Sequence, residues 1–232
     1  MGKWDDNNMG ALILLSDFTE NDNMNLKLKM REMFLEKKHT VSYIPSMSDR
    51  KLKYFEQAKG NLSKYGNFQF NYFDIDDFCN VDKIEKIFKS EIIYLSGGNT
   101  YYFLNNLKKR YLITRLRKYV ENGGHIIGLS AGAILMSKDI SSAKFGDEDI
   151  VGLSDLSSLA LVDFDFMPHW NEDCNYLDDL KEYSKNTGNT VYTCNDGDGI
   201  IVMDNRVNFY GDIKMIRQGE IMEVEGKNYV II

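Results

Sequence analysis

The chain has few cysteines, few prolines and fewer basic than acidic residues, features that argue against a secreted, a collagen-like or a nucleic-acid-binding protein. Its 232 residues include only 2 prolines and 3 cysteines. Because the cysteines are odd in number and lack C-x-x-C spacing, a disulfide framework and a structural zinc site are poorly supported, and we expect a reducing, cytoplasmic compartment. The 28 basic residues are outnumbered by 35 acidic ones, which gives a net charge of -7. Such a chain repels polyphosphate, so we expect no nucleic-acid partner.

Long apolar runs are missing as well. The first one, at residues 11–15, follows a tryptophan and two aspartates rather than a basic segment, and it is too short to span a bilayer. We therefore expect no signal peptide and no membrane partner. A hydrophobic content of 43% is enough to bury a large core, and the length fits a single α/β domain over residues 1–232.

Short β-rich runs alternate with amphipathic stretches as far as about residue 135, which is typical of β–α–β units. Strands joined by helical crossovers run parallel and are covered on both faces. The pattern therefore predicts a mostly parallel sheet between helices, followed after residue 199 by antiparallel hairpins. Expected strands are 10–16, 40–44, 68–73, 91–96, 125–129, 159–164 and 190–194, and expected helices are 24–38, 49–62, 81–89, 100–108, 113–122, 131–137 and 177–185.

The sequence Gly-Leu-Ser-Ala-Gly at 128–132 lies between an expected strand and an expected helix. In that context G-x-S-x-G indicates a nucleophile elbow, in which a sharp turn exposes the serine hydroxyl. Small neighbours on either side let strand and helix approach closely enough for the turn to form. Ser130 is therefore the candidate nucleophile. The alternative is an ordinary strand-to-helix turn whose serine caps the helix.

A serine nucleophile needs a base, and the chain has three histidines. We expect His39, between a lysine-rich helix end and a strand, to be solvated. His125 begins the strand that ends beside Ser130, about 16 Å away when extended, and so lies at the wrong end of the sheet. His169 follows an expected strand and emerges at the carboxyl edge, where open α/β sheets place their ligands. It is the candidate base.

The carboxylate that would orient this base is not fixed by the sequence alone. The candidates are Asp196 and Asp198 after the expected strand 190–194, Asp139 after the elbow helix, and Glu172 and Asp173 just beyond the histidine. Any one of these residues could instead be a solvated charge or part of an Asx turn.

The oxyanion donors are expected in the sequence Ser-Gly-Gly-Asn-Thr at 96–100, where a strand ends and a helix begins. Glycines there let backbone N–H groups approach a substrate. The Ala131 N–H, directly after the candidate nucleophile, would be the other donor. Alternatively this is a tight turn in which Asn99 caps the helix.

Together these segments resemble those of the S51 serine peptidases, the family of peptidase E (dipeptidase E) and cyanophycinase. Residues 96–100 resemble its glycine-rich oxyanion segment, residues 128–133 its nucleophile elbow, and the Met-Pro-His-Trp sequence at 167–170 its histidine motif. The resemblance implies a class I glutamine-amidotransferase-like (flavodoxin-like) fold. This is an α/β three-layer sandwich with a mostly parallel central sheet, here with C-terminal antiparallel hairpins.

The resemblance also implies the role of each site residue. Ser130 is the expected nucleophile and His169 the expected general base and acid, with Gly98 and Ala131 as oxyanion donors and Asn99 as a substrate contact. No metal and no organic cofactor is expected, and the expected partner is a short peptide substrate.

Two features depart from the family pattern. Asp196, the expected acid, stands where relatives carry a glutamate. Relatives that cleave after an N-terminal aspartate bind its side chain through an arginine downstream of the histidine, whereas no arginine occurs between His169 and Arg206. Lys181 or Lys185 could replace it only as a geometrically less selective cation.

The sequence thus predicts a dipeptidase-like serine peptidase. The alternatives are a cyanophycinase-like isopeptidase, another small amide hydrolase, or a non-catalytic ligand-binding module of the same fold. The C-terminal antiparallel segment has strand edges that could pair between subunits, so a homodimer is a further expectation.

Overall fold

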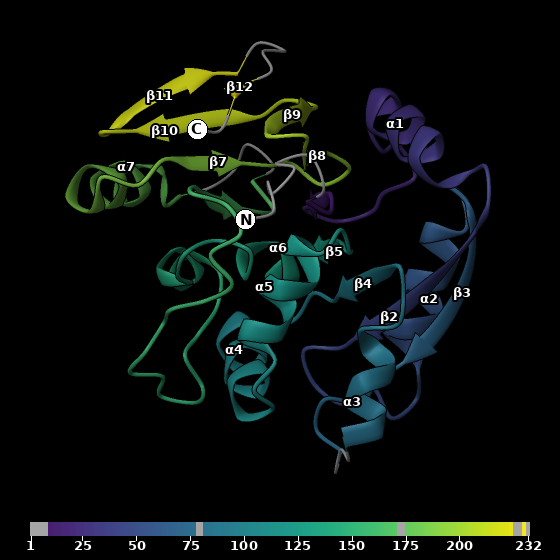
Figure 1. Cartoon of the computed structure of the whole chain (residues 1–232). Coiled ribbons are helices and arrows are strands. Elements are labelled where there is room, and N and C mark those ends of the chain that lie inside the picture. Colours follow the sequence, from purple (N-terminus) through teal and green to yellow (C-terminus); the bar gives the residue numbers. More distant parts are fainter. Residues whose placement is uncertain (1–8, 78–80, 171–174, 225–228, 231–232) are drawn as a thin grey trace, which may run out of the picture.

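Strands and helices alternate through the first half of the chain, as the sequence predicts (Figure 1). The structure is a computed structural model, and it describes residues 9–77, 81–170, 175–224 and 229–230. The elements up to the candidate elbow are β1 (Leu12–Leu15), α1 (Met24–Phe34), β2 (Lys38–Ile44), α2 (Lys53–Leu62), β3 (Asn67–Tyr72), α3 (Val81–Ile87), β4 (Ile92–Leu95), α4 (Thr100–Lys109), α5 (Ile113–Glu121) and β5 (His125–Leu129).

The second half begins with a short helix and ends in hairpins. Its elements are α6 (Ala131–Ile134), the 3-10 helix η1 (Ser141–Phe145), β6 (Asp165–Met167), α7 (Leu177–Thr187), β7 (Val191–Thr193), β8 (Gly199–Met203), β9 (Arg206–Tyr210), β10 (Lys214–Arg217), β11 (Glu220–Glu223) and β12 (Tyr229–Val230). Most elements coincide with the predicted ones apart from a few residues at their ends. Helix α2 begins later than predicted because the Asp49 carboxylate accepts hydrogen bonds from the amides of its first turn and so acts as a cap.

The strand predicted at residues 159–164 is wrong, since the strand of this region is β6. The amides of Leu159 and Leu161 donate instead to the carbonyls of Leu135 and Met136, at 3.0 and 2.8 Å, just beyond the end of α6. These apolar residues face the core, but their backbone completes the end of a helix rather than a sheet. The alternation of apolar residues therefore correctly indicated that the segment is buried, but it did not show that its backbone pairs with a helix end instead of a strand.

The main sheet has eight strands in the order β12-β9-β8-β1-β5-β4-β2-β3. The five strands from β1 to β3 in this order pair in parallel with their neighbours. The pairings of β8 with β1, of β9 with β8 and of β12 with β9 are antiparallel. A second sheet, in the order β11-β10-β7-β6, lies beside it near the C-terminal end of the chain (Figure 1). The predicted α/β class, with a mostly parallel central sheet and C-terminal antiparallel hairpins, is confirmed.

Strand β1 explains why helices cover both faces of the sheet. Leu12 and Leu14 pack into the core with α4, α5 and α6, whereas Ile13 and Leu15 pack on the other face with α1 and α2. All four side chains are at most 2% exposed. A strand that is apolar on both faces is the signature of a doubly covered parallel sheet.

The strand register sets which residues meet at the edge of the sheet. Leu15 pairs with Leu129, so β1 and β5 end together, with β4 on the other side of β5. The segments that leave these strands at their carboxyl ends therefore come together at one edge. No helix in the described ranges is long and apolar enough to cross a membrane.

Candidate active site

Ser130 occupies a strained turn between β5 and α6. Its φ is 50° and its ψ is -109°, a conformation that a non-glycine residue adopts only when its surroundings enforce it. The backbone N–H donates to the Leu15 carbonyl at 2.8 Å, which fixes the turn to the end of β1. The Ser130 hydroxyl makes no capping hydrogen bond to α6. The turn thus presents the hydroxyl outward, and the simple helix-cap alternative does not describe it.

Two glycines allow the close packing that this turn requires. A Cβ atom on Gly128 would lie 2.4 Å from the Gly132 carbonyl oxygen, and a Cβ atom on Gly132 would lie 2.2 Å from the Leu95 carbonyl oxygen. No side chain fits at either position without moving backbone. The first and last residues of the G-x-S-x-G sequence therefore bring β5, α6 and β4 into contact.

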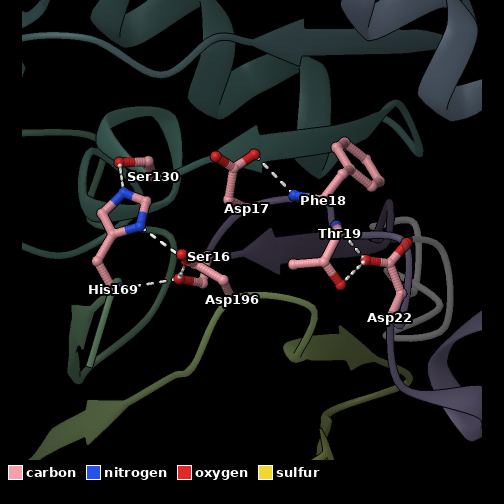
Figure 2. Close-up of polar contacts among 8 residues, drawn as sticks. All are labelled: Ser16, Asp17, Phe18, Thr19, Asp22, Ser130, His169 and Asp196. Atoms are coloured by element: carbon pink, nitrogen blue, oxygen red, sulfur yellow. Dashed lines mark hydrogen bonds and ion pairs between the residues drawn. The ribbon is translucent and has the colours of Figure 1, made fainter. Parts of the chain in front are cut away.

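His169 and Asp196 complete a chain of hydrogen bonds that starts at Ser130 (Figure 2). The Ser130 Oγ lies 2.8 Å from His169 Nε2, and His169 Nδ1 lies 2.7 Å from Asp196 Oδ1. A carboxylate can only accept, so Nδ1 carries the proton and Nε2 is left to accept from the serine hydroxyl. The three residues come from separate segments that follow β5, β6 and β7. This is the arrangement of a nucleophile, a base and an orienting acid.

Ser16, which sequence reasoning missed, lies behind this chain. Its hydroxyl accepts from the backbone N–H of His169 at 2.7 Å and donates to Asp196 Oδ1 at 2.7 Å (Figure 2). The residue is fully buried at the end of β1. One hydroxyl thus holds both the histidine backbone and the carboxylate. A polar residue just after a buried strand at the ligand edge was the signal that could have pointed to it.

The loop after β7 is tied to the segment after β1. The N–H of Gly197 donates to the Asp17 carbonyl at 2.8 Å, which holds Asp196 toward the histidine. Asp198, the neighbouring candidate, turns away and accepts from the Asp212 N–H at 3.0 Å. Burial raises the pKa of Asp198. It is a structural carboxyl group of this loop.

The other candidate acids do not contact the histidine in the described part of the chain. The Asp139 carboxylate accepts from the Ser141 N–H at 2.8 Å, within the irregular region after α6. Glu172 and Asp173 lie outside the described residues. Among described residues, no cluster of three or more histidine, cysteine, aspartate or glutamate side chains is suited to a metal ion.

The two remaining histidines lie at the opposite edge of the sheet. The Nδ1 of His125 accepts from the Ala11 N–H at 2.9 Å. The expectation that His39 is solvated is wrong, since it is 5% exposed. It packs edge-on against the Phe34 ring, with centroids 5.4 Å apart. Burial lowers the pKa of both histidines, which favours their neutral forms.

Of the two predicted oxyanion donors, Ala131 follows Ser130 directly and Gly98 lines the same cavity as Ser130. Gly98 has φ 128°, and a Cβ atom there would lie 2.1 Å from the Ser46 hydroxyl, so only glycine fits. A Cβ atom on Gly97 would lie 3.5 Å from the Ser130 Cβ, so this loop directly borders the candidate nucleophile. Within the described residues the N–H groups of Gly98 and Ala131 have no hydrogen-bond acceptor. Both assignments stay predictions.

The side-chain amide of Asn99 makes structural hydrogen bonds through both its oxygen and its nitrogen. Its oxygen caps α4 by accepting from the Tyr102 N–H at 2.9 Å, and its nitrogen donates to the Glu148 carbonyl at 2.9 Å. It does not line the cavity beside Ser130. The capping alternative matches these contacts, and nothing in the geometry supports the predicted substrate contact. Lys181 and Lys185, on α7, do not line this cavity either.

A cavity of about 410 Å³ opens beside Ser130, which is within the range of small-molecule sites. Its walls come from the segments after β1, β2 and β4 and from one face of α2. The lining residues are Asp17, Tyr43, Pro45, Ser46, Met47, Ser48, Asp49, Tyr54, Gln57, Ala58, Asn61, Tyr94, Ser96, Gly97, Gly98, Leu129, Ser130 and His169. No lysine or arginine of the described ranges is among them, so this wall is phenolic, amide-bearing and acidic.

Comparison with known proteins places these features in a family. The sequence profile of Peptidase family S51 matches residues 12–210. An uncharacterized peptidase of Pasteurella multocida is 29% identical over 135 residues, which cover 56% of this chain and 65% of that protein. An uncharacterized peptidase of Listeria monocytogenes is 32% identical over 136 residues, covering 57% and 66%. The matches thus span slightly under two thirds of these relatives.

Named and structural relatives agree with this result. Peptidase E of Salmonella arizonae is 36% identical over 87 residues, covering 38% of this chain and 37% of that protein. A crystal structure of a peptidase E-like protein from Listeria monocytogenes superposes with a TM-score of 0.70 at 24% identity, covering 94% of this chain and 100% of the other. A peptidase from an acI-B1 actinobacterium gives 0.72 at 14% identity, covering 96% and 97%. The structural matches show a shared fold.

Proposed function

Because the chain belongs to peptidase family S51, we propose that it is a serine peptidase that hydrolyses short, dipeptide-like substrates. The observation that carries the proposal is the hydrogen-bonded chain from Ser130 through His169 to Asp196, with links of 2.8 and 2.7 Å. The cavity beside the serine has room for an amino-acid residue and its neighbour rather than for a folded protein.

The proposed reaction follows from where each proton can go. The Ser130 Oγ attacks the substrate carbonyl carbon while its proton passes to His169 Nε2. Asp196, hydrogen-bonded to Nδ1, stabilises the imidazolium that forms. The C–N bond then breaks and the leaving amine takes the proton from Nε2. Water, activated by the same nitrogen, hydrolyses the acyl-enzyme and frees Ser130.

The negative charge that develops on the substrate oxygen needs donors in place before the reaction. Ala131 follows the serine directly, Gly98 lines the same cavity as the serine, and the N–H groups of both have no acceptor among the described residues. Loss of one such donor costs about 3–4 kcal/mol of transition-state stabilisation in serine peptidases. We assign them to the oxyanion hole.

A fluorophosphonate that reacts with activated serines tests this proposal. We expect it to add one label to the intact protein, at Ser130, and we expect the label to be lost in Ser130→Ala and strongly slowed in His169→Ala. A panel of dipeptides differing at the first residue then reads out hydrolysis. Intact, folded protein that neither takes the label nor cleaves any dipeptide would instead support a non-catalytic module of the same fold.

A further inference from the structure

The cavity beside Ser130 contains a carboxylate that the triad does not use. Asp17 follows Ser16 directly, and its Oδ1 accepts from the Phe18 N–H at 2.7 Å. Within the described residues its second oxygen has no donor. Figure 2 shows this carboxylate beside the Ser130–His169–Asp196 chain, with its drawn hydrogen bond going to Phe18, and both Asp17 and Ser130 line the cavity. A negative charge therefore faces the space in which a substrate of Ser130 would lie.

Tyr94, from the middle of β4, adds an independent observation in the same cavity. The residue is 1% exposed, and its hydroxyl has no hydrogen-bond partner among the described residues. Its ring stacks on Tyr43 with centroids 5.3 Å apart, which fixes its direction. Burial, with smaller contributions from Tyr43 and Asp17, raises the pKa of the phenol, so it stays neutral. Ser137, Ser142 and Thr193 also have buried hydroxyls without a partner among the described residues, but Tyr94 alone of these four lines the cavity beside Ser130, where a bound group can supply one.

The charged side chains that line the cavity indicate which chemical group the missing partner carries. Asp49 is the other carboxylate of the wall, but its oxygens are occupied by three amides at the start of α2. Because no described lysine or arginine lines the wall, the charge of Asp17 is left uncompensated. A half-buried carboxylate of this kind favours a cation, and a phenol oxygen can accept a further N–H of the same group.

We propose that Asp17 and Tyr94 form a subsite that binds a cationic nitrogen of the peptide substrate, and so set the specificity of the proposed peptidase. This inference rests on the proposed function. The cation has two sources in a peptide, the α-ammonium of the first residue and a lysine or arginine side chain. The α-ammonium is separated from the scissile carbonyl carbon by a single carbon, so it must lie near Ser130. The same subsite disfavours an aspartate at the first position, because like charges repel.

Diphenyl phosphonate analogues of amino acids test the subsite without knowledge of the leaving group. One reagent is a leucine analogue with a free α-amine, one is its N-acetyl form, and one is an N-acetyl lysine analogue with a free side-chain amine. In the parent protein we expect at least one cationic reagent to inactivate about 10- to 100-fold faster, in kinact/KI, than N-acetyl leucine, as a charge-assisted hydrogen bond allows. Preference for the first reagent identifies the α-ammonium, and preference for the third identifies the side chain.

Two variants separate Asp17 from general effects on charge and fold. Asp17→Asn keeps an oxygen for the Phe18 N–H and removes the charge, so we expect the ratio of cationic to neutral reagent to fall close to one. Tyr94→Phe removes only the unpartnered hydroxyl, and we expect the ratio to fall several-fold. Glu32→Gln, which breaks an exposed ion pair on α1, removes the same charge far from the cavity and should keep the parent ratio. Circular dichroism confirms that each variant is folded.

The outcomes distinguish this inference from the proposed function. If the fluorophosphonate labels Ser130 but no cationic reagent reacts faster than N-acetyl leucine, the subsite is wrong and the peptidase proposal stands. If the cationic advantage persists in Asp17→Asn, Asp17 does not create it and the inference is likewise wrong. If Ser130 takes no label from any reagent, the proposed function fails, and the subsite fails with it.

Discussion

The Ser16 hydroxyl and the Asp196 carboxylate are joined by a 2.7 Å hydrogen bond at the carboxyl edge of the sheet. The same carboxylate oxygen accepts from His169 Nδ1, and the serine oxygen accepts from the His169 backbone. The residue just after β1 therefore holds together two segments that follow it in the chain by more than 150 residues. Ser16 acts through the groups it positions rather than through the substrate.

We expect Ser16→Ala to slow fluorophosphonate labelling of Ser130 by about 10- to 100-fold, since a hydrogen bond to a charged group contributes about 1.5–3 kcal/mol. The matched control is Ser42→Ala, which removes a buried hydroxyl bonded to Ser90 elsewhere in the sheet. Ser16→Ala loses two hydrogen bonds and Ser42→Ala loses one, so the unfolding midpoint of Ser16→Ala should fall at least as far as that of the control. Equal labelling rates in the two variants would show that Ser16 is only structural.

The identity of the acid is tested by removing one carboxylate at a time. We expect Asp196→Asn to lower kcat for the best dipeptide by about 10²–10⁴-fold, because the amide no longer holds the histidine in the required tautomer. Asp139→Asn, which alters a turn after α6, should change kcat less than threefold, within about 0.6 kcal/mol. The reverse result would transfer the role from Asp196 to Asp139.

The elbow glycines make a prediction about stability. Gly132→Ala would place a methyl group 2.2 Å from the Leu95 carbonyl oxygen, so backbone must move, and we expect a loss of about 1–3 kcal/mol or more in urea unfolding. Gly60→Ala is the matched control, since this glycine lies within α2 with open space around it. Alanine is the better helix former, so that variant should gain about 0.5–1 kcal/mol. A stable Gly132→Ala protein would contradict the packing described for α6.

The buried histidines predict a loss of stability in acid. Burial lowers the pKa of His39 and His125, partly opposed by Glu91, so the unfolded chain binds more protons than the folded one. Their contribution is complete above the unfolded pKa of about 6.5 and falls as the pH drops through it. Asp165 and Asp198, whose pKa values burial raises, change stability with pH in the opposite sense.

Urea unfolding of the parent and of His39→Gln, at pH 7.5 and pH 5.5, isolates the histidine contribution, because both proteins share the same carboxyl groups. We expect the parent to lose more stability than the variant between these pH values. An equal loss in both would mean that His39 does not stay neutral in the folded protein.

Much of the fold could be predicted because buried apolar residues recur along the sequence at the spacings typical of strands and helices. The predicted strand 125–129 has the same bounds as β5, since its apolar run lies between turns. The stretch 159–164 could not be placed, because its apolar residues are buried without joining a sheet. His39 was misjudged for a related reason, since its packing against Phe34 and Phe68 depends on strands that meet only in the fold.

The candidate site was partly within reach of the sequence. Ser130 follows β5 of the main sheet, as predicted, whereas His169 follows β6 of the second sheet, so the edge of one parallel sheet does not by itself explain their contact. The choice of Asp196 over Asp139 depends on loop contacts and came from a family resemblance. Ser16 and Asp17 carry no motif, and their roles arise only from the register that ends β1 beside β5.

The hydrogen bond from the Gly197 N–H to the Asp17 carbonyl connects the proposed substrate-binding subsite with the loop that carries the acid. One short peptide segment anchors the loop that carries the acid and also presents the carboxylate assigned to the substrate cation. A ligand that binds the Asp17 carboxylate can therefore shift the position of Asp196 through this hydrogen bond. Substrates lacking that positive group should consequently turn over more slowly even when saturating, rather than merely bind more weakly.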